Sequence, residues 1–568
     1  MRYLTLNSPM AGFIDRLHHR GASVPQAASQ ASAVPDLRPM LIPLAAAQFL
    51  ASYDTSSMNV AISNIVADLN TTVTGVQTAL TLFTLTMAAL MIPGSKLTDI
   101  WGRKHCFVLG LWVYATGALL TALSPGLGMM ILGFSLLEGI GSALMIPPIY
   151  ILITVLVKDL KNRAKAFAVV SAAAGLGSAA GPLLGGFITT TITWRASFAG
   201  EVVAIMFILY LTKKIHEPPL EGTKPSFDLL GAVLSAAGLV FVVLGLLQAG
   251  DYGWLLARKD FAIGDTVLLQ EGDISPVIVL MGIGLALLGL FVLHIRRAEK
   301  KGKEPLVPTH IFRSRETNLG LVTQNSQWFI MIGTFFVVSV FLQVSRGYSA
   351  IETGLILTPA TAGILLASSR VGNMLTKRTP RTVIRAGFVL ALAGIVLLLL
   401  FVDTTSSVLS FAPGLFLLGF GAGAMLTVSV NLVQSSVPEV DQGALSGVSR
   451  SVSNLGSSMG TAVAGAVLIS ALISGISTMT AESTTLSQDD KEAITAAMKG
   501  DVSAVSDEQV RAALEGQPDA VVDEVTRINA ESRDRALGIA LIAVALVGLV
   551  GLGASIFLPK DAVPKAAT

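Results

Sequence analysis

The chain has 568 residues, of which 52% are hydrophobic and only 13% are charged, and its formal net charge is +2. A soluble domain carries about 25% charged residues, so this composition excludes an ordinary water-soluble protein. The single cysteine, Cys106, excludes an intramolecular disulfide framework and a zinc site built on cysteines.

About fourteen apolar runs follow one another along the chain, each long enough to cross a hydrocarbon core about 30 Å thick as a helix. The runs are continuous rather than alternating, and helices satisfy their own backbone hydrogen bonds in lipid, so we expect helices and not strands. The predicted spans cover residues 41–65, 75–94, 105–124, 129–157, 165–190, 197–212, 228–249, 274–295, 318–342, 351–373, 383–402, 407–433, 443–475 and 534–558. The predicted fold class is therefore an all-α integral membrane protein.

Two polar segments, "KKIHEPPLEGTKPSFD" and "HIRRAEKKGKEPLVP", are typical of linkers because of their proline and charge content. They divide the spans into six helices, two additional helices and six more. The predicted parts are an N-terminal tail at 1–40, a six-helix bundle at 41–212, a linker at 213–227, two additional helices at 228–296, a linker at 297–317, a second six-helix bundle at 318–559 and a C-terminal tail at 560–568. The N-terminal tail lacks the basic-then-apolar order of a signal peptide.

The basic residues predict the orientation of the spans. An even number of spans places both termini on one side, and the loops of that side hold Lys96, Arg103, Lys104, Lys158, Lys161, Arg163, Lys165, Arg296, Arg297, Lys300, Lys301, Lys303, Lys377, Arg378, Arg381 and Arg385. The short loops of the other side hold only Arg195, Arg258, Lys259 and Arg346. Because cytoplasmic loops carry the excess of Lys and Arg, we expect a multi-pass protein of the cell (inner or plasma) membrane with both termini in the cytoplasm.

One long segment, 477–533, is predicted to be an extracytoplasmic loop with twelve acids and five bases. Within it, "SDEQVRAALEG" has the pattern of a short helix, with Ser506 as the N-cap and Gly516 at the stop. A solvated loop is one interpretation, because charge runs are usually solvated faces. The alternative is a lid that attracts organic cations to the outer mouth.

An internal repeat links the fifth and thirteenth spans. "AGLGSAAGPLLGG" begins at Ala174 and "SNLGSSMGTAVAG" begins at Ser453, so that Gly177 matches Gly456 and Gly181 matches Gly460. Two six-helix halves of similar design that enclose a midplane site are the plan of many secondary transporters.

Four stretches carry a resemblance to a known family: "LTDIWGRK", "GLGSAAGPLLGG", "YDTSSMNVAISNI" and "GALSGVSRSVSNLGSSMG". With the span count, they resemble the major facilitator superfamily, and within it the fourteen-helix drug–proton antiporter branch (QacA/EmrB type). The resemblance implies the major facilitator fold, with two six-helix pseudo-repeats and two extra central helices.

The same resemblance implies roles for two motifs. Asp99, Gly102, Arg103 and Lys104 would form the cytoplasmic gate motif, in which charge-assisted hydrogen bonds lock the two halves. Gly177, Gly181, Pro182, Gly185 and Gly186 would form the antiporter Gly-Pro motif that seals the interface between halves. The simpler alternatives are that the charges only set topology and that the glycines are a packing stripe. This chain departs from the gate pattern at Ser95, where glycine is usual, and at Ile100, where a basic residue is common.

Acids inside the spans are the sharpest site signals, because an intramembrane ionisable residue is functional by default. Asp54 lies well inside the first span, Glu138 in the fourth and Glu201 in the sixth, where Glu201 has the alternative of pairing with Arg195. A carboxyl buried in hydrocarbon holds a proton more readily than one in water, so we expect these three to couple protons to substrate. The branch usually has an arginine where this chain has Ser135, so a basic partner is missing.

Polar residues elsewhere in the spans are predicted to line a central cavity, with helix–helix hydrogen bonding as the alternative. They are Asn59, Ser135, Gln324, Gln327, Trp328 and Asn431.

The predicted function is a secondary active multidrug exporter, a proton-coupled antiporter of amphipathic, cationic or neutral organic compounds that works by alternating access. The chain has no phosphate-cradling G-x-x-x-x-G-K-[ST] loop, so we do not expect ATP to be the energy source. The chain also lacks a pattern typical of an embedded protease or transferase, and we expect no enzyme activity, no metal, no cofactor and no nucleic-acid partner. The partners would be small molecules, protons and the lipid bilayer, with the chain acting as a monomer. One alternative is a dedicated exporter of one endogenous metabolite or lipid, with different or absent proton coupling. The other is a membrane sensor or scaffold that transports nothing.

Overall fold

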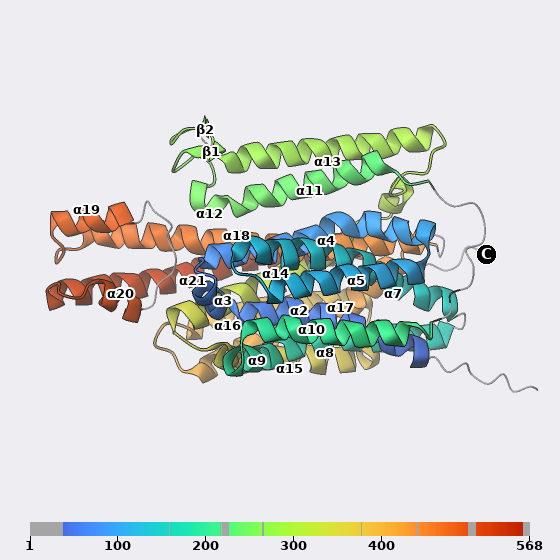
Figure 1. The fold of residues 1–568 in the computed structure, drawn as a ribbon, viewed down its shortest axis with the longest axis horizontal. Helices are drawn as coiled ribbons and strands as arrows, with labels where there is room; N and C mark the ends of the chain where they lie inside the picture. Colours follow the sequence, from blue (N-terminus) through green and yellow to red (C-terminus); the bar gives the residue numbers. More distant parts are fainter. Residues whose placement is uncertain are drawn as a thin grey trace, which may run out of the picture.

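A computed structural model describes residues 38–157, 160–215, 217, 226–263, 266–375, 378–438, 441–497 and 507–559. Long helices run side by side along one axis in this structure (Figure 1). The predicted tails at 1–40 and 560–568 lie outside the described residues except for 38–40, and so does most of the linker at 213–227.

The helices fall into three consecutive groups. The N-terminal group contains α2 (Arg38–Val60), α3 (Ile62–Asp68), α4 (Val73–Trp101), α5 (Arg103–Ala122), α6 (Leu127–Met130), η1 (Ile131–Glu138), α7 (Gly139–Leu156), α8 (Leu160–Ala180), η2 (Gly181–Gly185), α9 (Gly186–Thr191) and α10 (Trp194–Thr212). The added pair contains α11 (Leu229–Leu247), α12 (Ala249–Tyr252), β1 (Phe261–Ile263), β2 (Thr266–Leu269) and α13 (Pro276–Lys300). The C-terminal group contains η3 (Thr309–Arg313), α14 (Arg315–Val340), η4 (Phe341–Ser345), α15 (Ala350–Leu375), α16 (Pro380–Phe401), η5 (Val408–Ser410), α17 (Phe411–Gln434), α18 (Gln442–Glu482), α19 (Gln488–Ala497), α20 (Asp507–Ala513) and α21 (Asp519–Ile556).

The all-α membrane fold predicted from the sequence is confirmed. Among the described residues, thirteen helical segments are long and apolar enough to cross a membrane. The remaining predicted span, 41–65, corresponds to α2 and α3. Gln48, Asp54 and Asn59 lower the hydropathy of α2, yet all three side chains are buried and α2 lies among the other helices (Figure 1).

Two connections differ from the sequence expectation. A small antiparallel hairpin, β1 with β2, lies between α12 and α13, where no strand was predicted. The predicted loop at 477–533 is largely helical, because α18 continues to Glu482 and α21 begins at Asp519. We call the part of the molecule formed by residues 476–497 and 507–533 the helical extension (Figure 1, left). It has an apolar core of its own, in which Met479, Leu486 and Ile528 are buried.

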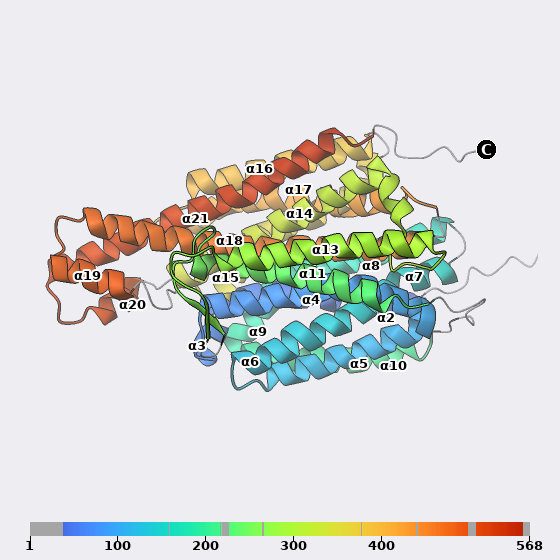
Figure 2. The same ribbon diagram turned by 90° about the horizontal axis from the view of Figure 1, so that it is seen from above.

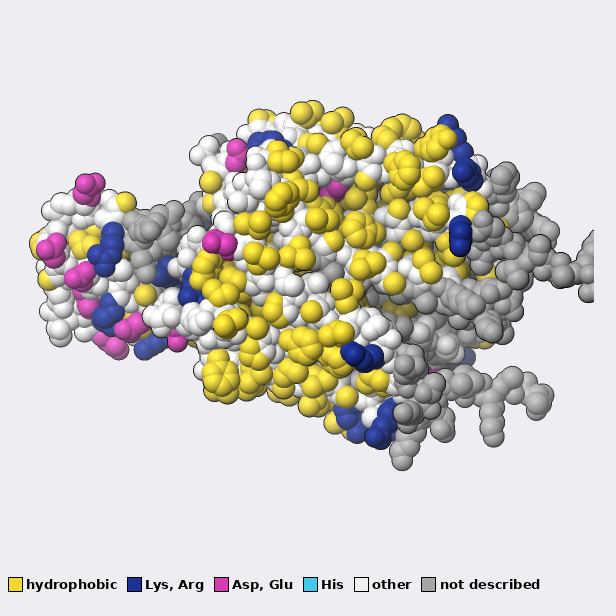
Figure 3. Space-filling view, turned by 90° about the horizontal axis from the view of Figure 1, so that it is seen from below, with side chains coloured by type: hydrophobic (Ala, Val, Ile, Leu, Met, Phe, Trp, Pro, Cys, Tyr) yellow, Lys and Arg dark blue, Asp and Glu magenta, His cyan; other side chains and the backbone are white. Residues whose placement is uncertain are grey.

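The two ends of the bundle differ. We call the end at which Gly102 joins α4 to α5 the turn end, and the opposite end, which carries the helical extension, the extension end. In Figure 3 the middle of the molecule is covered mostly by hydrophobic side chains, whereas Lys and Arg gather at the turn end and around the extension. This distribution matches a bundle with its apolar middle in lipid and its charges in water.

Close helix packing depends on the small residues of the repeat. A Cβ added at Gly177 on α8 would overlap the carbonyl oxygen of Phe49 on α2, and one at Gly456 on α18 would overlap the carbonyl oxygen of Asn325 on α14. The pair α2–α8 in the N-terminal group therefore has a counterpart, α14–α18, in the C-terminal group. Small residues allow such approach because packing rather than the hydrophobic effect holds helices together in lipid.

The added pair lies on the outside of the bundle (Figures 1 and 2). Its two helices contact each other through Gly238, where a Cβ would lie 3.1 Å from the backbone nitrogen of Leu288. Asp228 ties the turn end of the pair together, because its carboxylate accepts from the N–H groups of Gly231 (2.9 Å) and Leu306 (3.2 Å). Nε2 of His294 on α13 lies 2.8 Å from the same carboxylate.

These contacts change how Asp228 titrates. Partial burial alone would raise the pKa of Asp228, but the hydrogen bonds from Gly231, His294 and Leu306 outweigh it and hold the pKa below its usual range. A carboxyl whose pKa is lower in the folded than in the unfolded chain stabilises the fold above the unfolded pKa of about 3.9. That stabilisation is lost as the pH falls through the folded pKa.

We expect Asp228→Ala to lower the free energy of unfolding at pH 7 by about 0.5–2 kcal/mol, the usual cost of losing an N-cap. Thermal unfolding of the purified protein should show the full difference at pH 7. The difference should shrink as the pH falls below ~4 and vanish once the pH has passed below the lowered pKa of Asp228 in the folded protein, where the wild-type carboxyl is protonated. Glu271→Ala, at an exposed acid in the connection between β2 and α13, is the control and should leave the melting temperature unchanged. An equal loss for Asp228→Ala at both pH values would contradict this account.

A pair of substitutions on one helix tests the glycine packing. Gly177→Ala should lower the free energy of unfolding by about 1–3 kcal/mol, the cost of overpacking, because the new methyl group meets the backbone of α2. Gly175→Ala, two residues away, meets nothing within 4 Å and should be neutral or stabilising, since Ala favours helix over Gly by about 1 kcal/mol. Equal melting temperatures for the two variants would mean that α2 does not depend on this approach.

Candidate functional site

Three acids from three different helices meet inside the N-terminal group. Asp54 comes from α2, Glu138 from the end of η1 and Glu201 from α10, and one carboxylate oxygen of each lies within 4.8 Å of the others. Asp54 and Glu138 are fully buried, and Glu201 is 2% exposed. The structure thus brings together the three acids that the sequence singled out, and we call them the acid cluster.

Hydroxyl groups satisfy only part of this cluster. Oη of Tyr114 donates to Oδ2 of Asp54 at 2.7 Å, and Oγ1 of Thr121 donates to Oε1 of Glu138 at 3.1 Å. Oδ1 of Asp54, Oε2 of Glu138 and both oxygens of Glu201 are buried and have no hydrogen-bond partner within the part of the chain that the structure describes. Four carboxylate oxygens are therefore available for protons or for a cation.

The suggested pairing of Glu201 with Arg195 is wrong. Arg195 instead makes an ion pair with Asp68, which follows α2 in the chain, and its Nη2 donates to the carbonyl oxygen of Ser124 at 2.7 Å. Across the described ranges, no Lys or Arg forms an ion pair with any member of the acid cluster. Three ionised carboxylates at this spacing without a counter-charge would be prohibitively costly in a low-dielectric interior.

The chemistry of the cluster follows from its oxygen-only surroundings. Its charge can be neutralised by protons on the carboxyl groups, or by one hard cation that prefers oxygen ligands. Protons need no vacant volume, whereas a metal ion needs space at its coordination distance. The arrangement can therefore take up and release protons as a unit whose members titrate together.

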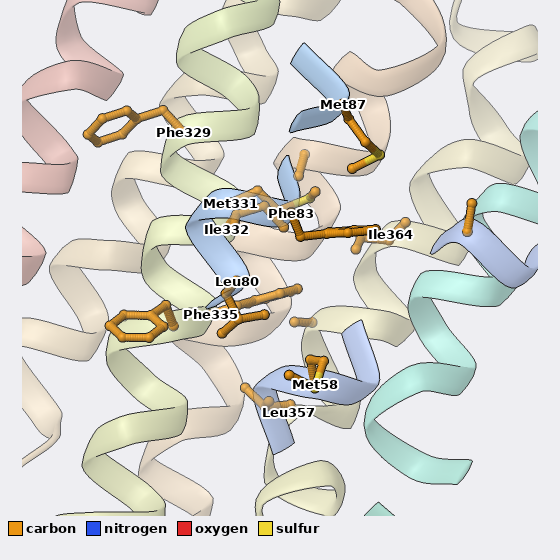
Figure 4. Close-up of a cluster of buried hydrophobic side chains, with 14 of the residues drawn as sticks. Met58, Leu80, Phe83, Met87, Phe329, Met331, Ile332, Phe335, Leu357 and Ile364 are labelled. Carbon is orange, nitrogen blue, oxygen red and sulfur yellow. The ribbon is translucent and has the colours of Figure 1, made fainter. Parts of the chain in front are cut away.

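The cluster lies within the N-terminal group and not between the two groups. Its members and hydroxyl partners come only from α2, α5, η1 and α10. A cluster of buried apolar side chains lies between the groups, among them Met58 and Phe83 from one group and Met331 and Phe335 from the other (Figure 4). A molecule held between the groups would therefore touch apolar and sulfur atoms first.

The residues predicted to line a cavity are dispersed. Ser135 and Gln324 make helix–helix hydrogen bonds, as the alternative interpretation had it: Oγ of Ser135 donates to the carbonyl oxygen of Ala79 (2.8 Å) and Oε1 of Gln324 accepts from Oγ of Ser449 (2.8 Å). The side chains of Asn59 and Gln327 are buried, Trp328 is partly buried and Asn431 is exposed. Nε2 of Gln327 is without a partner among the described residues.

The gate motif is held by a residue that the sequence analysis missed. Glu217, which follows α10, accepts from the backbone N–H groups of Arg103 (3.0 Å) and Lys104 (2.9 Å) and so caps the first turn of α5. Nη1 of Arg103 lies 3.7 Å from the same carboxylate, and Nη2 lies 3.6 Å from Asp99. Gly102 has a φ of 99°, a left-handed value that suits glycine.

The charged side chains of the motif therefore pair within the N-terminal group and the segment directly after it. Asp99, Arg103 and Glu217 all belong to it or to the segment directly after it. Within the ranges that the structure describes, no ion pair of Asp99 or Arg103 reaches the other half, so the predicted lock is not observed there. Contact across the groups near the turn is made by Ser95, whose Cβ lies 3.0 Å from the position of a Cβ at Gly447 on α18. Glu217 could have been found from the sequence, because it is an acid in "HEPPLEG", a segment predicted to lie on the same, cytoplasmic side as the gate motif.

The Gly-Pro motif contacts both α2 and the other group. Gly181 and Gly185 face Ser56 and Ser57 of α2, with the same close approach as Gly177. On its other side, Gly186 meets the backbone of Ala350, and the carbonyl of Pro182 meets Gly354, both on α15. This is the position at which a motif could seal the contact between the groups.

The extension end is closed by further hydrogen bonds between the groups. Oε1 of Gln343, in η4, accepts from N (3.0 Å) and Oγ (3.1 Å) of Ser63, and its Nε2 donates to the carbonyl oxygen of Asn59 at 2.8 Å. The backbone N–H of Ile351 on α15 donates to Oγ1 of Thr190 on α9 at 3.1 Å. The helix of Asp54 is thus tied to the C-terminal group at this end.

Comparisons with known proteins agree with this architecture. A family model described as Major Facilitator Superfamily matches residues 44–461. The puromycin resistance protein pur8 of Streptomyces alboniger is 28% identical over 419 residues, 73% of this chain and 78% of that protein. The cephamycin export protein CmcT of Amycolatopsis lactamdurans is 28% identical over 72% of this chain and 80% of its own length. The multidrug transporter protein MdtP of Bacillus subtilis is 28% identical over 72% of this chain and 71% of its own length.

Solved structures share the fold at low sequence identity. A bacterial homologue of the human lysosomal transporter Spinster, in an inward-facing conformation, has a TM-score of 0.57 at 16% identity and covers 94% of this chain and all of its own. A peptide transporter in complex with alafosfalin has a TM-score of 0.58 at 14% identity, with 91% of this chain and 94% of that one covered.

The capping role of Glu217 can be tested by stability. Glu217→Ala should lower the free energy of unfolding by about 1–2 kcal/mol, because two backbone N–H groups of α5 lose their acceptor. Glu217→Gln, which keeps one acceptor oxygen, should lose about half of that. The matched control is Glu304→Ala, since Glu304 is 59% exposed and pairs with Lys96 at the same end, and exposed pairs contribute little. Identical melting temperatures for Glu217→Ala and Glu304→Ala would count against the cap.

Proposed function

This chain belongs to the Major Facilitator Superfamily, and from that premise we propose that it is a secondary active multidrug exporter driven by protons, which works by alternating access. The observation that carries the proton part is the acid cluster of Asp54, Glu138 and Glu201. It is buried, within a membrane bundle, and lacks a basic partner among the described residues. The relatives named for resistance or export support the direction of transport.

The energetics favour protons as the neutralising species. Each carboxylate that stays charged in the bundle costs several kcal/mol without a partner, so a protonated resting state is the low-energy one. One proton moving inward across 100 mV releases about 2.3 kcal/mol, enough for roughly fifty-fold accumulation of cargo. The missing arginine fits this scheme, because Ser135 bonds to a backbone carbonyl and supplies no charge that would hold the acids ionised.

Coupling would be indirect, since the cluster does not lie between the groups. Asp54 is on α2, and the same helix carries Asn59, whose carbonyl oxygen accepts from Gln343 of the other group. Tyr53, next to Asp54, contacts Ser197 of α10 through its hydroxyl at 2.7 Å. Loss of a proton from the cluster would change how α2 sits against α5 and α10, and with it the closure at the extension end. In this proposal, cargo and protons do not compete directly for Asp54. They compete because they favour different conformations of the protein.

The apolar side chains between the groups support the substrate class. Met58, Met87 and Met331 are buried there beside Phe83 and Phe335 (Figure 4). Methionine is unbranched and polarizable, so such a surface adapts to different shapes. An amphipathic organic compound, cationic or neutral, suits this lining better than a sugar or an amino acid, which would leave polar groups without partners.

The remaining parts of the proposal concern place and assembly. The turn end, with its Lys and Arg side chains (Figure 3), would lie in the cytoplasm together with both termini. The protein would reside in the cell membrane, act as a monomer and consist of two six-helix bundles with the added pair between them in sequence.

Proton release on substrate binding tests the proposal. The purified protein in detergent should release protons into a weakly buffered solution when a lipophilic cation is added at pH 7, and Asp54→Asn and Glu138→Gln should release fewer or none. Glu482→Gln, at an exposed acid outside the bundle, is the matched control and should behave as wild type. Substrate binding without proton release from any variant would overturn proton coupling.

A substrate panel separates the proposal from its rivals. In cells, wild type should give resistance to several unrelated amphipathic compounds, and Asp54→Asn should reduce efflux to background while leaving the protein folded. Accumulation of one endogenous compound in a deletion strain, with no change in resistance, would instead favour a dedicated exporter. Absence of flux for every compound, with normal folding, would favour a sensor or scaffold.

A further inference from the structure

An open cavity of about 390 Å³ lies at the extension end, well apart from the acid cluster in the fold. It is bounded by Trp254, by one face of α18 that includes Ser470, Ser474 and Thr478, and by Arg535 and Ile539 of α21. Three parts of the molecule therefore meet around it: the connection after α12, and two helices of the C-terminal group.

Local packing gives the cavity its walls. At Gly475, α18 approaches α21 so closely that a Cβ there would lie 3.1 Å from Cβ of Ser532. Trp254 packs against a buried apolar cluster to which Ala249, Ala466 of α18 and Val277 of α13 belong. Gly475 and Trp254 both line the cavity, so these contacts fix two parts of its wall.

The polar side chains that line the cavity are one guanidinium and three hydroxyls, all of which can donate hydrogen bonds. Ser470, Ser474 and Thr478 recur every four residues, so their hydroxyls share one face of α18. Oγ of Ser470 is buried and has no partner in the described part of the chain. Arg535 is exposed and forms no ion pair with any described residue. A guanidinium with a row of hydroxyls beside it is suited to a phosphate oxygen.

The position of the cavity relative to the lipid bilayer indicates which kind of anion it binds. From Ile539 onward α21 presents exposed apolar side chains, including Ile539 at 48%, Ile542 at 50% and Leu546 at 58%. Such a stripe faces lipid tails, so Arg535, one turn before it, lies where the hydrocarbon ends. Tryptophan and arginine are the side chains that gather at this level of a bilayer.

We propose that this cavity binds one phospholipid with a net negative headgroup. Its phosphate lies against Arg535 and the hydroxyls of Ser470, Ser474 and Thr478, and one acyl chain follows Ile539 along α21. The bound lipid joins the connection that carries Trp254 to α18 and α21, and so fastens the added pair to the C-terminal group. This role does not depend on what the protein exports or on the acid cluster.

Fluorescence of Trp254 provides the test. In a variant that keeps only this tryptophan, with Trp101, Trp112, Trp194 and Trp328 replaced by Phe, brominated phosphatidylglycerol should quench at roughly fivefold lower mole fraction than brominated phosphatidylcholine, the preference expected from one arginine at a membrane surface. Arg535→Gln in the same background should abolish the preference. Arg511→Gln, at an exposed arginine of the helical extension, is the control and should retain it.

Native mass spectrometry of the full chain with all its tryptophans guards against misfolding of the fluorescence variant. Wild type should retain one phosphatidylglycerol through delipidation, and Arg535→Gln should not. Soluble glycerol phosphate should neither bind nor displace the lipid; if it does, the site is for free phosphate esters and the lipid proposal is overturned. Equal quenching by the two lipids, or unchanged preference in Arg535→Gln, would overturn it as well.

Discussion

Three carboxyl groups meet inside a membrane bundle with no counter-charge among the described residues, and the N-terminal group is arranged around that constraint. Tyr114 and Thr121 reach inward from α5 to donate hydrogen bonds to it. Arg195, the nearest candidate for neutralising it from the sixth span, is engaged by Asp68 and a backbone carbonyl. Because an ionised trio is so costly in low dielectric, the state of these acids and the packing of α2, η1 and α10 cannot change independently.

The packing itself is a repeated design. The same glycine spacing brings α8 against α2 and α18 against α14, so each group contains one closely packed pair built from its first and fifth helices. In the N-terminal group this pair carries a second contact, since the Gly-Pro motif at its end meets α15 across the boundary. Any movement of α2 would therefore pass to α8 through close contact with its backbone and could reach α15 of the other group at the extension end.

Sequence reasoning identified what depends on local composition. Hydropathy located the spans, because a helix in lipid must be apolar over its own length, and the run at 41–65 was long enough to be included despite Asp54 and Asn59. Each member of the acid cluster was singled out separately, because an ionisable side chain inside a membrane span costs free energy and is therefore usually functional. That the three meet, and that Arg195 pairs elsewhere, depends on the rotation of α2, η1 and α10 about their axes, which hydropathy and composition do not determine.

Glu217 was missed for a similar reason, since its partners are backbone N–H groups on α5, distant in sequence. The helical extension was predicted as a loop because its many charges exclude lipid, but charge does not exclude a helix in water.

The separation of the acids from the space between the groups bears on how such a protein can have broad specificity. A carboxylate that touched cargo directly would favour compounds able to replace its proton, and its strength as a ligand would vary with each compound. Here one cluster of buried side chains between the groups is apolar and rich in methionine, so on the proposed function recognition at that cluster depends on shape and apolar area. On the same proposal, the driving force would come from protonation of the acid cluster, which the cargo would not touch. The cargo and the proton would then interact only through the position of α2. For any cargo, linkage requires that the cargo changes the affinity for the proton by the same factor by which the proton changes the affinity for that cargo. A single proton site can thus serve many substrates.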